Sequence, residues 1–221
     1  VSYSNTSSGS AITVGHGLSK APEIIFVKNR DKVSQFACYS KVVGATKYLA
    51  ISDTDAPATY SGYWNDTNPT TNVFLLGTDD DVRGGSSGNK VIAYCFHSVD
   101  GYSKVGSYIS NSNNDGPFVY TGFRPAYVMV KSSSYSNSET MWSVWDSKRP
   151  SYNPSDLQIY ANSGLGEGQR EDGGGAEGND IDFTANGFKL RDSPWSSNAS
   201  NGATYIFIAF AEQPFKHSNA R

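Results

Sequence analysis

Charged residues are scarce in this sequence, and so are long apolar runs. Only 18% of its 221 residues are charged, below the ~25% typical of soluble domains. The 18 basic residues are outnumbered by 21 acidic ones and form no basic stripe, so we expect no nucleic-acid partner. No apolar run approaches the ~18 residues of a membrane span, so we expect no membrane insertion.

Cysteine is also rare, with Cys38 and Cys95 as its two instances. Both lie in apolar runs, where a free thiol behaves as a small hydrophobic group, so buried thiols are favoured and a disulfide stays the alternative. The chain begins at Val1, without an initiator methionine or the features of a signal peptide, and we expect it to be a piece of a longer polypeptide.

The apolar residues that are present occur in short runs rich in β-branched and aromatic side chains. Residues 23–28, 73–76 and 91–96 are examples, and each predicts a strand. Clusters of Gly, Asn, Asp, Ser and Pro separate the runs, as at 79–85 and 110–117, and these are typical of turns. No sustained 3.6-residue period occurs, so the pattern predicts an all-β protein without long helices.

The two halves of the chain resemble each other. Residues 17–28 match 122–131, with Pro22 and Pro125 ahead of the predicted strand in each, and residues 92–96 match 206–210. Proline is tolerated at the start of a strand but not in a central ladder, which fits both positions. We interpret the chain as two tandem copies of a unit of ~100 residues.

The repeat predicts an antiparallel β-sandwich in which residues 1–104 form the first copy and 105–221 the second. One copy alone has little core with which to cover its apolar face. We therefore expect a single compact unit with a pseudo-two-fold relation between the copies, and two separate small sandwiches are the alternative.

The sequence offers no recognisable catalytic motif. Its three histidines accompany no nucleophile motif, and His16 is interpreted as a structural turn residue. Asp53, Asp55 and residues 79–81 are interpreted as turn carboxylates, although a glycosidase would need two carboxylates facing each other across a cleft. Loop carboxylates can hold calcium, but their spacing matches no EF-hand. We predict no catalytic residue, no metal site and no cofactor.

Aromatic residues in polar loops are the candidate ligand contacts. Tyr60, Tyr63 and Trp64 cluster in the first copy, while Tyr152 and Trp195 lie among Ser, Asn and Pro in the second. Such rings present apolar faces at low entropic cost, and a sugar ring can stack on them. The alternative for Trp64 is a structural role in covering the sandwich.

Several motifs spread over nearly the whole chain resemble a known family. They lie at residues 44–49, 64–67, 92–96, 116–125, 145–149, 152–154, 186–191 and 210–216. The sequence resembles a domain of unknown function that recurs at the C-terminus of bacteriophage tail-fibre-like and other virion surface proteins. The resemblance implies a β module exposed on the virion, and it assigns no catalytic or binding residue.

We therefore expect a non-enzymatic virion structural protein, the distal part of a tail fibre that attaches to a host-surface glycan or protein without hydrolysing it. A purely structural capsid decoration or fibre adaptor is the first alternative, and a carbohydrate-degrading tail spike is the second. Expected partners are the host receptor and other virion proteins. Fibres of this kind are usually homo-oligomers, and a trimer is favoured because several copies give avidity to weak sites.

Overall fold

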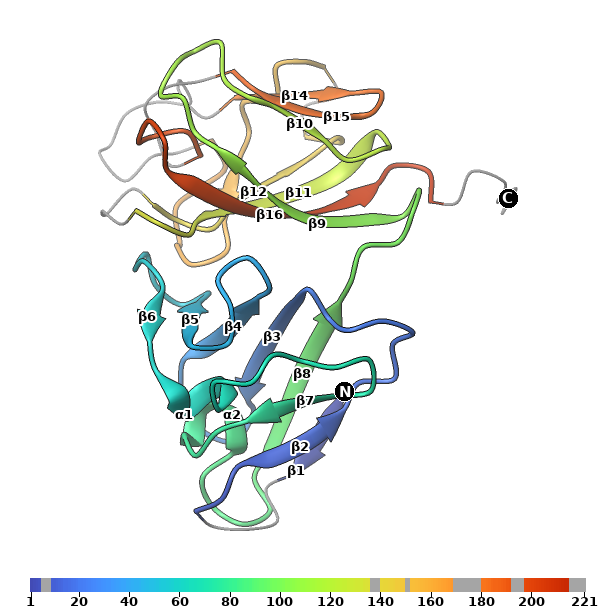
Figure 1. The fold of residues 1–221 in the computed structure, drawn as a ribbon. Coiled ribbons are helices and arrows are strands. Elements are labelled where there is room, and N and C mark those ends of the chain that lie inside the picture. Colours follow the sequence, from blue (N-terminus) through green and yellow to red (C-terminus); the bar gives the residue numbers. More distant parts are fainter. Residues whose placement is uncertain (5–8, 136–139, 150–151, 169–179, 192–196, 215–221) are drawn as a thin grey trace. The chain divides into compact units, whose positions relative to one another are not determined.

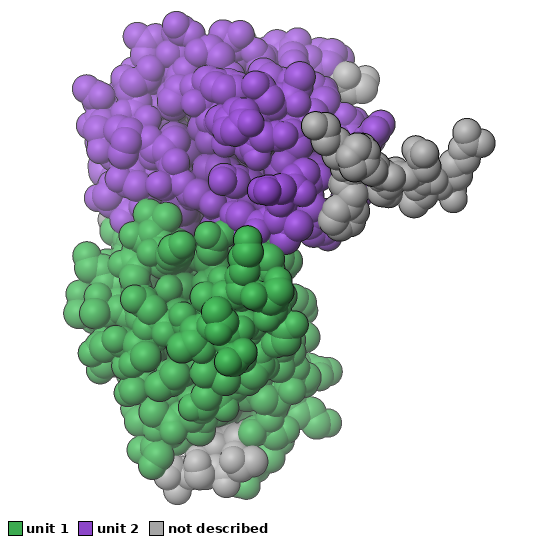
Figure 2. Space-filling view, turned by 45° about the vertical axis from the view of Figure 1, so that its right-hand side comes forward, with its two compact units in different colours: residues 1–97 green, residues 98–221 purple. Residues whose placement is uncertain are grey.

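A computed structural model of the chain describes residues 1–4, 9–135, 140–149, 152–168, 180–191 and 197–214. Strands make up 41% of the structure and helices 4%, which confirms the prediction of an all-β protein. The chain divides into two compact units, unit 1 (Val1–His97) and unit 2 (Ser98–Arg221), which Figure 2 shows in different colours.

Unit 1 consists of a six-stranded sheet and a two-stranded sheet, both antiparallel (Figure 1). The large sheet has the order β1-β8-β3-β4-β5-β6, and the small sheet pairs β2 with β7. Two one-turn helices, α1 (Ser61–Trp64) and α2 (Asp80–Arg83), flank β7 along the chain. The strands are β1 (Ser2–Ser4), β2 (Ile12–Gly15), β3 (Ile24–Asn29), β4 (Phe36–Ser40), β5 (Lys47–Ala50), β6 (Ala58–Thr59), β7 (Val73–Leu76) and β8 (Lys90–Phe96).

The core of unit 1 lies between its two sheets. Ile25 and Val27 on β3 pack in one buried cluster with Phe74 and Leu76 on β7. Alternate strand residues point to the same face, so each strand contributes every second side chain to this cluster. Burial of that apolar area stabilises the unit by about 25 cal/mol per Å².

Unit 2 also stacks a small antiparallel sheet on a large one, and Figure 1 shows the two layers one above the other. The large sheet has the order β13-β12-β11-β16-β9 and the small sheet β10-β15-β14. Val119, Phe183 and Phe188 of the small sheet share a core with Val128 and Trp145 of the large one. The strands are β9 (Ser103–Ile109), β10 (Phe118–Tyr120), β11 (Pro125–Ser132), β12 (Ser143–Asp146), β13 (Ile159–Tyr160), β14 (Ile181–Thr184), β15 (Gly187–Leu190) and β16 (Thr204–Ala211).

The order of strands corresponds between the units, because β1-β8-β3-β4-β5 in unit 1 has the counterpart β9-β16-β11-β12-β13 in unit 2. Registers correspond as well. Ile25 lies opposite Cys95, and Val128 lies opposite Ala209, which are the pairs that the sequence match implies. These correspondences support the interpretation as tandem copies, and the two-fold relation between the copies stays a prediction.

The division into units differs from the sequence prediction of one compact unit with a copy boundary after residue 104. Each unit covers its own apolar face with a small sheet, which corresponds to the alternative of two separate small sandwiches. The boundary falls after His97 because the following residues belong to a turn of unit 2. Val99 pairs with Ser103 there, and Val105 N donates to Ser98 Oγ at 3.0 Å.

The two cysteines are free thiols. Cys95 on β8 lies opposite Ile25 of β3, whereas Cys38 on β4 lies opposite Phe26. Consecutive residues of β3 point to opposite faces, and the strands on its two sides are about 9–10 Å apart. A disulfide cannot span that separation, so both cysteines are thiols, as the sequence favoured, with Cys38 buried and Cys95 half-buried.

Three buried or half-buried tyrosines predict a loss of stability at alkaline pH. Burial raises the pKa of Tyr39, Tyr127 and Tyr205 to about 12. Their unfolded-state pKa is about 10, so their stabilising contribution is complete below pH ~10 and is lost as the pH rises toward 12. We expect the urea midpoint to fall over this interval, and less steeply in Tyr127→Phe. A midpoint independent of pH between 10 and 12 would contradict the assignment.

Candidate ligand-binding site

Helix α1 positions the three aromatic residues that the sequence singled out in the first copy. Tyr60 is its N-cap residue, and Tyr63 and Trp64 lie in its single turn. Trp64 is 1% exposed, and its ring meets that of Tyr39 edge to face at 5.7 Å. A ring buried in this way cannot stack on a ligand, so Trp64 takes the structural role that was its alternative.

Tyr60 and Tyr63 form a cluster with Tyr48, which lies on β5. The ring centroids of Tyr48 and Tyr63 are 4.4 Å apart, those of Tyr60 and Tyr63 5.4 Å, and those of Tyr48 and Tyr60 6.0 Å. Tyr63 is buried and supports the other two, while Tyr60 is exposed and Tyr48 half-buried. The face of the cluster that is open to solvent is therefore made by Tyr60 and Tyr48.

Two carboxylates hold the hydroxyl groups of this cluster. Tyr60 donates to Asp79 Oδ2 at 2.8 Å, and Tyr63 donates to Asp81 Oδ2 at 2.9 Å. Asp79 is also the N-cap of α2, where its Oδ1 accepts a hydrogen bond from Asp81 N at 2.8 Å. Both carboxylates are thus fixed by the first turn of α2, a position in which acidic residues are stabilised by the unpaired N–H groups of the helix.

Two further carboxylates lie near Tyr48. Asp53 and Asp55 line a small hollow together with Tyr48, and Asp55 N donates to Asp53 Oδ1 at 3.2 Å. Burial, followed by the charges of Asp53, Asp55, Asp79 and Asp81, raises the pKa of Tyr48. We call these three tyrosines and four aspartates the tyrosine–aspartate site. Its members are Tyr48, Asp53, Asp55, Tyr60, Tyr63, Asp79 and Asp81.

Two glycines allow this arrangement. A Cβ atom on Gly62 would overlap the ring of Tyr60, which therefore lies directly against the helix backbone. A Cβ atom on Gly77 would overlap the backbone carbonyl of Gly62, so the end of β7 can approach α1 closely. A hydrogen bond from Gly77 N to Tyr63 O at 2.8 Å stabilises this contact. The two glycines therefore let the Tyr60 ring and the end of β7 pack closely against the backbone of α1.

The predicted residues of the second copy do not form a comparable cluster within the described part of the chain. Tyr152 is 67% exposed and precedes Asn153. Asn153 exchanges two hydrogen bonds with Phe183 on β14, at 2.9 and 3.0 Å. Tyr152 is therefore an exposed ring beside a fixed edge of unit 2, and Trp195 lies outside the described residues.

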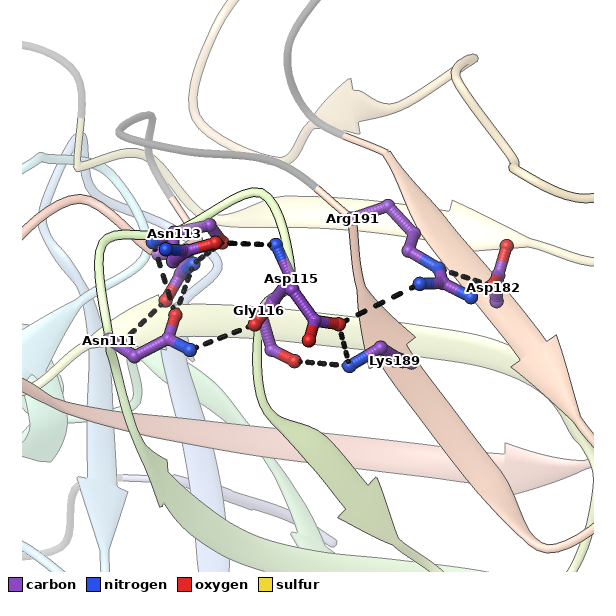
Figure 3. Close-up of polar contacts among 8 residues, drawn as sticks. Asn111, Asn113, Asp115, Gly116, Asp182, Lys189 and Arg191 are labelled. Carbon is purple, nitrogen blue, oxygen red and sulfur yellow. Dashed lines mark hydrogen bonds and ion pairs between the residues drawn. The ribbon is translucent and has the colours of Figure 1, made fainter.

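A rigid polar loop precedes β10 in unit 2 (Figure 3). Asn198, fully buried, donates from Nδ2 to Asn111 Oδ1 and to Asn113 O, both at 3.0 Å, and its Oδ1 accepts from Asn111 N at 3.0 Å. Asn113 Oδ1 accepts from Asp115 N at 2.8 Å. These bonds fix residues 111–115, which lie in a stretch that the sequence predicted to be a turn.

At the tip of this loop Asp115 forms ion pairs with two basic side chains, those of Lys189 and Arg191 (Figure 3). Lys189 Nζ lies 2.8 Å from its Oδ1 and Arg191 Nη1 lies 3.9 Å from it, while Arg191 Nε lies 2.5 Å from Asp182 Oδ2. The hydrogen bond and charge of Lys189, with a smaller contribution from Arg191, lower the pKa of Asp115. A general acid needs the opposite shift, so Asp115 is suited to accepting hydrogen bonds.

Two exposed rings follow the loop. Phe118 and Tyr120 on β10 are 47% and 63% exposed, whereas Val119 between them is buried. Their spacing places both rings on the outer face of the small sheet, about 7 Å apart along the strand. Sequence reasoning missed this pair, because residues 118–120 are all apolar or aromatic and the sequence does not show which of them face outward.

His16 has a structural role in unit 1. His16 is buried, and its Nδ1 accepts a hydrogen bond from Leu18 N at 3.1 Å. The proton is therefore on Nε2, which donates to Thr70 O at 3.1 Å. Both ring nitrogens are used in holding the chain, as expected for a structural turn residue. Among the described residues, no group of three or more His, Cys, Asp or Glu side chains is arranged to hold a metal ion.

These features define a two-unit, all-β protein with an aromatic and acidic surface site in unit 1. Residues 1–214 match the model of a domain family of unknown function, DUF7483, and the chain belongs to this family. No curated protein and no solved structure matches the chain. Within the described residues, none of the helices has the length and apolar character required to cross a membrane.

Proposed function

We propose that the chain is a surface module of a bacteriophage virion, the distal part of a tail fibre, which attaches to a host-surface glycan without hydrolysing it. The observation that carries the proposal is the exposed Tyr60 ring, held by Asp79 beside Tyr48. Aromatic faces stack on the C–H faces of sugar rings, and carboxylates accept hydrogen bonds from sugar hydroxyls. The combination is typical of carbohydrate recognition.

The arrangement favours binding over hydrolysis. A glycosidase needs one carboxyl group that donates a proton and a second that acts as nucleophile or base. Both oxygens of Asp79 already accept hydrogen bonds, from Tyr60 and from Asp81 N. Asp79 therefore has the surroundings of an acceptor that orients a ring, and Tyr63 engages Asp81 in the same way.

A single shallow site of this kind binds weakly. A homotrimeric fibre would present three copies, and the linked copies would raise the overall avidity well above the affinity of one site. This is the reason for proposing an oligomer and an attachment to other virion proteins. A capsid decoration or fibre adaptor has no need of such a site.

The test is binding of the purified chain to a panel of isolated bacterial surface polysaccharides, with reducing ends assayed in the same tubes. We expect saturable binding without sugar release. Tyr60→Ala should weaken it about tenfold, the equivalent of about 1.4 kcal/mol, because the exposed stacking face is lost. Tyr60→Phe keeps the ring and should retain most of the affinity.

Tyr94→Ala is the matched control, since Tyr94 is a similarly exposed tyrosine of unit 1 on β8, outside the site. The affinity of this variant for the polysaccharide should equal that of the unaltered chain. A folded chain that binds no polysaccharide would favour the purely structural role, and released reducing ends would favour the tail spike.

A further inference from the structure

The outer face of the small sheet in unit 2 carries two exposed rings, Phe118 and Tyr120 on β10, which we call the aromatic platform. A Cβ atom on Gly187 would lie 3.0 Å from Cζ of Phe118, so the Phe118 ring leans over this glycine of the neighbouring strand. The Tyr120 hydroxyl lies 3.6 Å from the position of a Cβ atom on Gly122. Both rings therefore lean over glycines instead of standing away from the sheet, and they leave an open apolar surface.

A hollow of about 400 Å³ adjoins the Tyr120 end of the platform. Gly122 joins the two features, because it lines the hollow and also contacts the Tyr120 ring. The other lining residues are Asp100, Gly101, Phe123 and Gln213. Sites for small ligands have volumes of roughly 300–1,000 Å³, so the hollow has room for one sugar residue.

Asp100 and Gln213 supply polar atoms to the hollow. Both residues are exposed, and within the described part of the chain neither side chain makes a hydrogen bond or an ion pair. The turn that carries Asp100 is fixed by a hydrogen bond from Tyr102 N to Val99 O at 3.0 Å. A carboxylate accepts hydrogen bonds from hydroxyl groups, and an amide both donates and accepts them. The hollow can therefore bind hydroxyl groups of a ligand that stacks on the platform.

The charges beside the platform balance each other (Figure 3). Lys189 lies directly opposite Phe118, and its Nζ pairs with Asp115 at 2.8 Å. Arg191 Nε pairs with Asp182 at 2.5 Å. A charged ligand would have to compete with these ion pairs, whereas a neutral ligand can stack on the rings without disturbing them. This face of unit 2 therefore suits an uncharged ligand.

We propose that unit 2 carries a second glycan-binding site, made of the aromatic platform and the adjoining hollow, whose ligands are neutral hexose glycans. Phe118 and Tyr120 stack on the C–H faces of sugar rings, while Asp100 and Gln213 bind sugar hydroxyls. The inference rests on the proposed glycan-binding function and adds a site to it. Two weak sites on one chain raise the avidity for a repetitive polysaccharide.

The test is calorimetry with uncharged hexasaccharides of glucose, mannose and galactose, and with a galacturonic acid hexasaccharide as the acidic comparison. The full chain is used with Tyr60→Ala, which removes the exposed ring of the site in unit 1. We expect saturable binding of at least one neutral probe. The acidic probe should bind at least about fivefold more weakly than that neutral probe, because it has to compete with the ion pairs.

Two variants on this background test the rings. Tyr120→Ala should weaken binding of the neutral probe about fivefold, because a stacking face is lost. Ile109→Ala is the matched control, since Ile109 is 56% exposed on β9 of the large sheet, outside the platform and the hollow. The affinity of this control for the neutral probe should stay unchanged.

Asp100→Asn tests the hollow. Asn is as well suited to a turn as Asp, so the backbone should keep its conformation. We expect about fivefold weaker binding of the neutral probe, because hydrogen bonds to a charged acceptor are stronger than those to a neutral one. Asp156→Asn makes the same change elsewhere in unit 2, outside the residues that line the hollow, and should have no effect.

Three results would overturn the second site: no binding of any neutral probe to the folded chain, equal binding of the acidic probe, or unchanged affinity in both Tyr120→Ala and Asp100→Asn. The polysaccharide panel then separates the two proposals. Binding there that Tyr60→Ala weakens would leave glycan attachment with a site in unit 1 alone. No binding to any polysaccharide would remove the glycan-binding function as well.

Discussion

Replacing Trp145 with alanine is expected to lower the free energy of unfolding of unit 2 by about 3–5 kcal/mol. Trp145 is completely buried on β12, opposite Val128, in the cluster that joins the two sheets of the unit. Removal of the indole ring loses its transfer free energy and leaves a cavity that the surrounding strands fill incompletely. The measurement is urea unfolding combined with hydrogen exchange.

Trp64→Ala is the matched comparison in unit 1, where Trp64 is equally buried in a separate cluster. We expect each variant to lose exchange protection mainly in its own unit, residues 98–214 for Trp145→Ala and residues 1–97 for Trp64→Ala. Uniform loss over the whole chain in both variants would contradict the assignment of two cores.

Replacing Asn198 with alanine is expected to destabilise unit 2 by about 2–3 kcal/mol. The side chain is fully buried and makes three hydrogen bonds of 3.0 Å to Asn111 and Asn113. Alanine removes three hydrogen bonds, to two acceptors and one backbone N–H, and each such bond contributes about 0.5–1.5 kcal/mol. Chemical denaturation measures the loss.

Asn114→Ala is the control, because Asn114 is exposed in the same loop. Its substitution should change stability by less than about 0.5 kcal/mol. Hydrogen exchange should also show residues 111–116 opening in Asn198→Ala and staying protected in Asn114→Ala. Equal stability of the two variants would mean that the Asn198 network does not hold the loop.

The sequence predicted the strands better than it predicted how the sheets pack on each other. The apolar runs at 73–76 and 91–96 became β7 and β8, since a short β-branched run buried on one face has few alternatives. The absence of long helices was also correct for the described residues, in which α1 and α2 have one turn each. A small sheet over each large one was only the alternative of two small sandwiches, because sequence patterns indicate an apolar face without saying what covers it.

The candidate site shows the same limit. Tyr60 was correctly chosen as an exposed ring, but Trp64, four residues later in the same polar stretch, turned inward with the single turn of α1. Tyr48 was missed because its position on β5 resembles that of any strand residue. Asp79 was interpreted as a turn carboxylate, and its contact with Tyr60 depends on the close approach of Gly62 and Gly77, which no local pattern reveals.

The placement of the two thiols makes the chain a convenient carrier for a chemical label. Cys38 is fully buried, and burial raises the pKa of the Cys95 thiol to about 11, so neither supplies much reactive thiolate at neutral pH. Val33, by contrast, is 99% exposed in the loop between β3 and β4. A Val33→Cys variant therefore offers one readily alkylated position for a dye or a surface tether while both native cysteines stay in place.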